Sequence, residues 1–175
     1  MNSLTDSVVA TRLFLVMLLP AVGCAPLQAQ GPSASASDPE REAVLAVVQA
    51  FFDTMAAKDV AGARRTVVPE GRFHSAGQQD GKPRIRAFTS EDYLKDLSVP
   101  MKPNVRERMW NPEVRIRGFV ASVWTPYDFW RDGKFSHCGI DSFDLIKTDE
   151  GWRIAGISYT VESKCEPSPL GPLKQ

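Results

Sequence analysis

Two side chains beside a predicted β-hairpin turn have the types that acid–base chemistry requires. Asp132-Gly133 is a strong signal for a two-residue turn, and runs of β-branched and aromatic residues flank it. Counting back from this turn places Asp128 opposite His137. Directly opposed Cβ atoms lie about 4.5–5.5 Å apart, so a carboxylate–imidazole hydrogen bond is within reach. Such a bond raises the basicity of the histidine and selects its tautomer, whereas the alternative is a solvent-exposed polar pair without catalytic role.

The same count assigns one face of the predicted sheet to a ligand cavity. A four-residue loop at residues 148–151 would align the last two strands, with Asp141 opposite Ser158. The resulting face is apolar at one end and polar at the other, as in small-molecule sites. Its members are Val120, Trp124, Asp128, His137, Asp141, Phe143, Leu145, Ile154 and Ser158. We therefore expect His137, Asp128 and Asp141 as catalytic groups, and His74, Trp124, Phe143 and Ser158 as ligand contacts.

Other site classes have no signal in the sequence. Histidine occurs only at positions 74 and 137, and no metal-binding spacing of histidine or cysteine is present, so we expect no metal and no cofactor. A phosphate loop, a nucleophile elbow and a dinucleotide fingerprint are also absent. The 21 basic and 21 acidic residues balance, which argues against nucleic acid as a partner. The charged run at residues 106–108, together with Arg115 and Arg117, alternates in strands and is interpreted as a solvated face.

Helical and strand patterns occupy separate halves of the chain. Asp38-Pro39-Glu40 is typical of a helix start, and apolar residues then recur at helical spacing to about Ala57. The further elements expected before residue 100 are a short helix at 60–67, a short strand at 72–75, a loop at 77–81 and a short helix at 89–97. Strand patterns follow at 105–110, 113–130, 135–147 and 152–163. This order predicts an α+β domain at residues 38–165, with helices on one face of a curved antiparallel meander sheet.

Several motifs in this order resemble the nuclear-transport-factor-2-like (NTF2-like) superfamily over residues 40–162. They are Phe51-Phe52-Asp53, Gly71-Arg72-Phe73, the segment 118–124, and Gly151-Trp152-Arg153-Ile154. The superfamily includes ketosteroid isomerases, SnoaL-like polyketide cyclases, scytalone dehydratase and many exported proteins of unknown role. The resemblance implies a cone-like fold with a cavity between the sheet and the helices. No single enzyme's catalytic set matches this chain, so no catalytic residue is carried over.

The N-terminal residues have the pattern of an export signal. Arg12 precedes an apolar run at residues 13–23, which is shorter than the roughly twenty residues of a membrane-spanning helix. One interpretation is a signal peptide at residues 1–29, cleaved before Gln30. The other is a lipoprotein signal at 1–23, with a lipid on Cys24 as the membrane attachment. Both predict an exported, periplasmic or extracellular protein with a flexible linker at 30–37 and a Pro-rich tail at 166–175.

Two further features bear on assembly. Export would permit a disulfide between Cys138 and Cys165. A straight last strand would separate these residues by roughly 13 Å, so the bond needs a bend after Glu162. A buried free Cys138 is the alternative.

The second predicted sheet face is apolar and includes Val123, Ile140, Ile157, Tyr159 and Val161. Such a face marks an interface, and the resemblance implies a homodimer formed through it.

Three functions follow from these observations. The first is an exported domain that binds a small apolar or aromatic molecule in its cavity. The second is a cofactor-free isomerase, dehydratase or cyclase in which His137, held by Asp128, moves a proton with help from Asp141 or His74. The third is a protein-interaction module that uses the sheet face. The sequence identifies neither a ligand nor a reaction.

Overall fold

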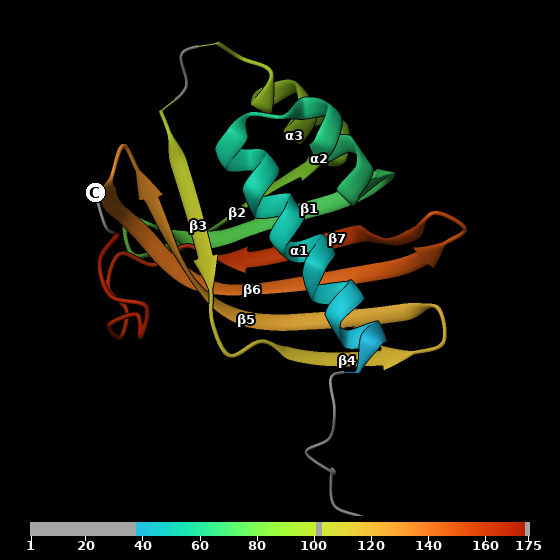
Figure 1. The fold of residues 1–175 in the computed structure, drawn as a ribbon. Helices are drawn as coiled ribbons and strands as arrows, with labels where there is room; N and C mark the ends of the chain where they lie inside the picture. Colours follow the sequence, from blue (N-terminus) through green and yellow to red (C-terminus); the bar gives the residue numbers. More distant parts are fainter. Residues whose placement is uncertain (1–37, 101–102, 174–175) are drawn as a thin grey trace, which may run out of the picture. The chain divides into compact units, whose positions relative to one another are not determined.

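The computed structural model describes residues 38–100 and 103–173. The predicted signal peptide, the predicted linker and Cys24 lie outside the described residues. The elements, in chain order, are α1 (Pro39–Ala57), α2 (Val60–Thr66), β1 (Val67–Gln79), β2 (Lys82–Thr89), α3 (Ser90–Leu97), β3 (Val105–Met109), β4 (Glu113–Arg117), β5 (Val120–Arg131), β6 (Lys134–Thr148) and β7 (Gly151–Thr160). Figure 1 shows α1 crossing one face of the sheet, with α2 and α3 near β1 and β2. The α+β class predicted from the sequence is confirmed.

The long helix α1 forms as its sequence predicts. The carboxylate of Asp38 accepts a hydrogen bond of 3.0 Å from the backbone N–H of Glu40, and Pro39 occupies the first turn. Four apolar side chains one helical turn apart are buried against the sheet: Val44, Val48, Phe51 and Phe52. The helix ends where Lys58 adopts a left-handed conformation, with φ of 56°. Its apolar face therefore forms one wall of the domain interior.

The strands form a mixed sheet rather than a purely antiparallel one. The strand order is β2-β1-β7-β6-β5-β3, and β4 pairs with β5. All neighbours are antiparallel except β1 and β7, which are parallel. The predicted loop at 77–81 is wrong, because Asp80-Gly81 is a hairpin turn with positive φ at both residues that joins β1 to β2. Polar residues and Pro83 hide the β2 strand pattern in the sequence.

A first β-bulge changes the register of β5 against β6. The two residue pairs next to the Asp132-Gly133 turn are as predicted. The register then shifts by one residue, so that His137 pairs with Phe129 and Cys138 pairs with Asp128. The predicted pairing of Asp128 with His137 is therefore wrong. Because side chains alternate between the two sheet faces, one extra residue places Asp128 and His137 on opposite faces.

A second β-bulge has the same effect between β6 and β7. The predicted pairs hold from the turn up to Leu145 with Ile154. The register then shifts, because Ala155 is an extra residue in β7, and Asp141 pairs with Tyr159. As a result Tyr159 lies on the face that carries Asp141, where Ser158 was expected. The two bulges together exchange the predicted inner and outer residues of β5 and of the second half of β7.

The exchange also corrects the predicted dimer face. Val123 and Ile157 are 1% and 5% exposed and belong to the core. The outer face of the sheet instead carries the exposed side chains Val120, Trp124 and Ile146. An apolar outer face is therefore present, but three of the residues expected there, Val123, Ile157 and Tyr159, lie on the inner face. Within the described residues, no helix has the length and apolar character of a membrane span.

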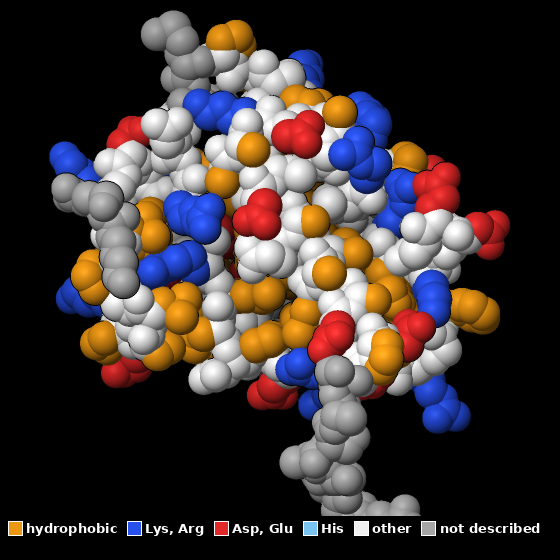
Figure 2. All heavy atoms as spheres, in the orientation of Figure 1, with side chains coloured by type: hydrophobic (Ala, Val, Ile, Leu, Met, Phe, Trp, Pro, Cys, Tyr) orange, Lys and Arg blue, Asp and Glu red, His pale blue; other side chains and the backbone are white. Residues whose placement is uncertain are grey.

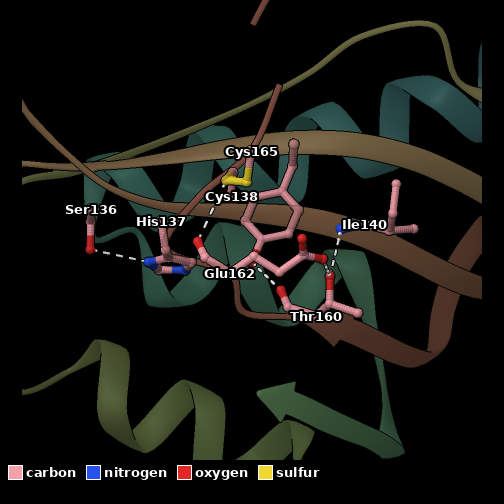
Figure 3. The surroundings of a disulfide bond; sticks show 8 residues. Ser136, His137, Cys138, Ile140, Thr160, Glu162 and Cys165 are labelled. Carbon is pink, nitrogen blue, oxygen red and sulfur yellow. Dashed lines mark hydrogen bonds between the residues drawn. A yellow bond between two sulfur atoms is a disulfide. The ribbon is translucent and has the colours of Figure 1, made fainter. Parts of the chain in front are cut away.

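A disulfide links Cys138 of β6 to Cys165 after β7, with Cα atoms 6.3 Å apart (Figure 3). The bond forms because β7 ends at Thr160, and the backbone of Glu162 then pairs with that of Cys138. Of the two alternatives that the sequence left open, the structure contains the disulfide. The chain beyond it returns over the outer sheet face, where the carbonyl of Gly171 accepts a hydrogen bond of 2.7 Å from Arg108.

Candidate functional site

An aromatic cavity of about 450 Å³ lies between α1, α3 and the concave face of the sheet. Phe51 of α1 is central to it, because its ring stacks on Tyr93 of α3 with centroids 4.9 Å apart and meets Phe73 edge-on at 6.1 Å. The other apolar and aromatic lining residues are Phe52, Met55, Phe88, Tyr127, Phe129, Phe143, Ile157 and Tyr159. These flat walls are suited to a planar apolar molecule.

Two acidic side chains meet in this cavity. Glu107 of β3 and Asp141 of β6 share a hydrogen bond, although they come from strands separated by β5. Asp141 is 2% exposed, and one of its carboxylate oxygens is buried without a hydrogen-bond partner in the described structure. The hydroxyl of Tyr93, which also lines the cavity, is likewise buried and unpartnered. Buried polar groups are nearly always hydrogen-bonded, so these atoms are available to a ligand.

Burial controls the protonation of this carboxyl pair. It raises the pKa of Asp141 to about 8, and the hydrogen bond from Glu107 opposes part of that effect. The pKa of Glu107 is also raised well above its usual value, first by burial and then by the nearby charge of Asp141 and by the hydrogen bond that the proton of Glu107 makes to it. Glu107 therefore keeps its proton and donates it in the shared hydrogen bond. The pair offers both a donor and acceptors to a ligand, and Asp141 can exchange a proton near neutral pH.

Strand alternation explains why Glu107 faces inward. Glu107 lies opposite Phe129, which lines the cavity, whereas Arg108 lies opposite Asp128 on the other face. The solvated face predicted for residues 106–108 is therefore wrong for Glu107. The signal in the sequence is that Glu107 stands between Arg106 and Arg108, since alternation along a strand places it on the opposite face from both arginines. It was not decisive, because the sequence does not show which face of β3 is covered.

Asp128 takes part in a different ion pair from the one predicted. Its carboxylate accepts hydrogen bonds of 2.8 Å from Nε and 2.5 Å from Nη2 of Arg108. Side-chain exposures of 3% for Asp128 and 15% for Arg108 make this a buried pair on the outer face. His137 faces the cavity, and its Nδ1 lies 3.1 Å from the hydroxyl of Ser136. Burial and the charge of Arg131 lower the pKa of His137, so its imidazole is neutral at pH 7.

The other predicted site residues divide between the two faces. Phe143 lines the cavity, as do Asp141 and His137. Trp124, Ser158 and His74 instead lie in one row across the outer face, because Trp124 pairs with Ser142, Ser142 with Ser158, and Ser158 with His74. Trp124 is 53% exposed. The two bulges exclude Trp124 and Ser158 from the cavity. His74 is excluded because side chains alternate along β1 and its neighbour Phe73 faces the cavity.

Metal ligation has no support in the described geometry. Among residues 38–100 and 103–173, no group of three or more His, Cys, Asp or Glu side chains is placed to hold a metal ion. The carboxyls of Glu107 and Asp141 are bonded to each other. The titratable groups that line the cavity are carboxyl, phenol, imidazole and guanidinium groups.

A protein-family model described as "Putative lumazine-binding" matches residues 39–160. This chain belongs to that family. The match covers α1 to β7 and thus every element that lines the cavity. The fold is the NTF2-like cone that the sequence motifs predicted. No curated protein matches the sequence.

Solved structures share the fold of this lumazine-binding family member. A protein of unknown function with a cystatin-like fold from Nostoc punctiforme is 10% identical, with a TM-score of 0.59, and the match covers 77% of this chain and 97% of that one. An NTF2-like superfamily protein from Salmonella enterica is 14% identical, with a TM-score of 0.58 and coverage of 77% and 99%. A structure described as a dehydratase of the NTF2-like family from Streptomyces avermitilis is 14% identical, with a TM-score of 0.57 and coverage of 73% and 99%. At these identities the likeness establishes the fold alone.

Proposed function

We propose that the protein binds a small planar heteroaromatic molecule, with its polar edge on Glu107 and Asp141. The observation that carries the proposal is the unpartnered buried oxygen of Asp141 in an aromatic cavity. A buried polar atom of this kind costs about 1–3 kcal/mol unless a ligand or water forms a hydrogen bond with it. A ligand carbonyl or N–H would remove that cost, and the aromatic walls would hold the attached ring.

The carboxyl pair favours an amide-like ligand edge. The proton of Glu107 is used in the shared hydrogen bond, and Asp141 is itself protonated at neutral pH. The unpartnered oxygen of Asp141 can therefore donate to a ligand carbonyl and, once ionised, accept from a ring N–H. Lumazine, a pteridinedione, has such N–H and C=O groups on a flat fused ring. The family description is therefore consistent with the cavity, and we take lumazine as the test ligand.

Titration of lumazine into the protein, followed by the ligand's fluorescence, tests this function. Asp141→Ala should weaken binding by about tenfold or more, because it removes the hydrogen bond to the polar edge of the ring. Asp144→Ala is the matched control, since Asp144 is an exposed aspartate on the outer face of the same strand. Equal affinity of the wild type and Asp141→Ala, or no binding by the wild type, would refute the proposal.

Proton-transfer catalysis is a second candidate function, supported by the pKa of about 8 for Asp141. A cavity carboxyl that titrates near neutral pH can act as a general acid or base in an isomerase, dehydratase or cyclase reaction. Asp141 and Glu107 would then take the roles that the sequence suggested for His137 and Asp128. Turnover that is abolished by Asp141→Asn but retained by Asp128→Asn would support this candidate; the opposite result would exclude it.

The exposed outer face of the sheet is suited to contact with a second copy of the chain. We propose a homodimer formed through the outer sheet face around Trp124, in place of the predicted contact at Ile157.

We also propose that the chain is exported, because a disulfide such as Cys138–Cys165 persists in oxidising compartments. Mass spectrometry of the mature N-terminus tests export: cleavage before Cys24 or Gln30 supports it, and an intact N-terminus refutes it.

A further inference from the structure

One row of residues connects the carboxyl pair to the edge of the sheet. Asp141 pairs with Tyr159, Tyr159 with Ser75, and Ser75 with Arg86 on the edge strand β2. Residues paired across neighbouring strands share a face, so all four side chains lie on the concave side. Strands are spaced about 4.8 Å apart, which puts the Cα of Arg86 roughly 14 Å from that of Asp141. An arginine side chain that extends back along this row ends at the mouth of the cavity.

A second cation reaches the same mouth from β5. The guanidinium of Arg131 lies over the ring of Phe129, 5.7 Å from its centroid. Phe129 in turn stacks on the imidazole of His137, with centroids 4.7 Å apart. This stack holds a guanidinium and an imidazole on one wall, and all three residues line the cavity.

The cavity continues into a groove of about 320 Å³ at this point. Arg86, Arg131, His137 and Tyr159 line both spaces, so these four residues surround the junction between them. The ring-binding part of the cavity is lined by aromatic side chains, whereas the groove adds Ser75 and Gln78 and is more polar. A ligand that fills the cavity would therefore extend its tail between Arg86 and Arg131.

The two arginines lack acidic partners, unlike the other arginine near the site. In the part of the chain that the structure describes, neither Arg86 nor Arg131 forms an ion pair with a carboxylate. Arg108 is paired with Asp128, and the cavity carboxylate of Asp92 accepts capping bonds from Thr89. Two uncompensated guanidinium groups on either side of a cavity mouth are a favourable environment for an anion.

We propose that Arg86, Arg131 and His137 form an anion-binding subsite at the mouth of the cavity. The natural ligand is then an aromatic molecule that carries a carboxylate, sulfonate or phosphate group on the end opposite the carboxyl pair. Each guanidinium can donate two hydrogen bonds to such a group, and the neutral His137 can donate one from Nε2. This inference rests on the proposed function, because it assumes that the cavity holds an aromatic ring.

A matched pair of fluorescent probes tests the subsite. N-phenyl-1-naphthylamine is neutral, and 8-anilinonaphthalene-1-sulfonate is the same ring system with a sulfonate group. The wild type should bind the sulfonate at least about tenfold more tightly than the neutral probe. The Arg86→Gln/Arg131→Gln double variant should still bind the neutral probe but should bind the two probes with equal affinity.

The control variant is Arg115→Gln, which removes one positive charge on the exposed strand β4, where residues pair with the opposite end of β5. It should keep the wild-type preference for the sulfonate. Loss of that preference in Arg115→Gln, or its survival in the double variant, would overturn the subsite while leaving the proposed function intact. Failure of the wild type to bind the neutral probe would instead refute an aromatic-binding cavity, and with it both proposals.

Discussion

The buried carboxyl of Asp141 should make the stability of the protein fall as the pH rises. Its pKa in the folded protein is about 8, against 3.8 for an unperturbed aspartate, because burial penalises the charged form. The folded state therefore binds this proton more tightly than the unfolded state does. Stability from this group is fully present below about pH 4 and is lost as the pH rises through the folded-state pKa near 8.

The expected magnitude follows from the slope of that dependence. Between pH 5 and 7 the unfolded carboxyl is ionised and the folded one is protonated, so folding takes up about one proton. The free energy of unfolding then falls by about 1.4 kcal/mol for each pH unit, or about 3 kcal/mol over this range. Asp141 is 2% exposed, so solvent screening removes little of the effect.

The experiment compares urea denaturation of the wild type and Asp141→Asn at pH 5, 6 and 7. Asparagine keeps the shape but cannot ionise, so the variant should lose about 3 kcal/mol less stability than the wild type between pH 5 and 7. Asp144→Asn on the exposed face of the same strand should behave like the wild type. Parallel pH profiles for the wild type and Asp141→Asn would show that Asp141 is ionised in the folded protein, and the carboxyl-pair argument would fail.

Three other variants test the remaining contacts. Arg108→Ala should lower the free energy of unfolding by about 3–5 kcal/mol, because it leaves Asp128 buried without a partner; a loss below 1 kcal/mol in urea denaturation would mean that the pair is solvated. The Cys138→Ser/Cys165→Ser variant should lose roughly 3–4 kcal/mol, as expected for a sequence separation of 27 residues, and two free thiols besides Cys24 in the unreduced wild type would contradict the bond. Trp124→Lys should convert a dimer to a monomer in light scattering, and an unchanged mass would place the interface elsewhere.

The sequence predicted the helices well because their signals are local. The cap at Asp38 and the Thr89–Asp92 capping box both form, and the latter begins α3 as expected. Hairpin turns were predictable for the same reason, since Asp132-Gly133 carries its own conformational preference. The parallel contact between β1 and β7 had no local signal, because it joins segments far apart in the chain.

The candidate site was less predictable because the sheet faces depend on register. His137, Asp141 and Phe143 were assigned to the cavity correctly, because they lie an even number of residues apart on β6 and so share one face. Asp128 and Ser158 were assigned to it wrongly. Each bulge adds one residue, which exchanges the inner and outer faces of the neighbouring strand. A bulge depends on packing across strands rather than on a residue type, so no sequence pattern marked either position.

The outer face of the sheet explains how the inner carboxyl pair is held in place. β3 is an edge strand, bonded only to β5 in the described sheet, and Glu107 is at its centre. The neighbouring Arg108 points to the other face, where it binds both Asp128 and the carbonyl of Gly171. Gly171 belongs to the tail that the disulfide at Cys165 ties to β6.

These outer contacts fix the position of β3 along β5. Because side chains alternate between the two faces of a strand, the same contacts also fix where Glu107 enters the cavity. Asp128, which the sequence placed opposite His137, therefore has a positioning role. Asp128 holds Arg108, and Arg108 keeps the strand that presents Glu107 to Asp141. The geometry of the carboxyl pair on the concave face thus depends on an ion pair and a disulfide on the convex face.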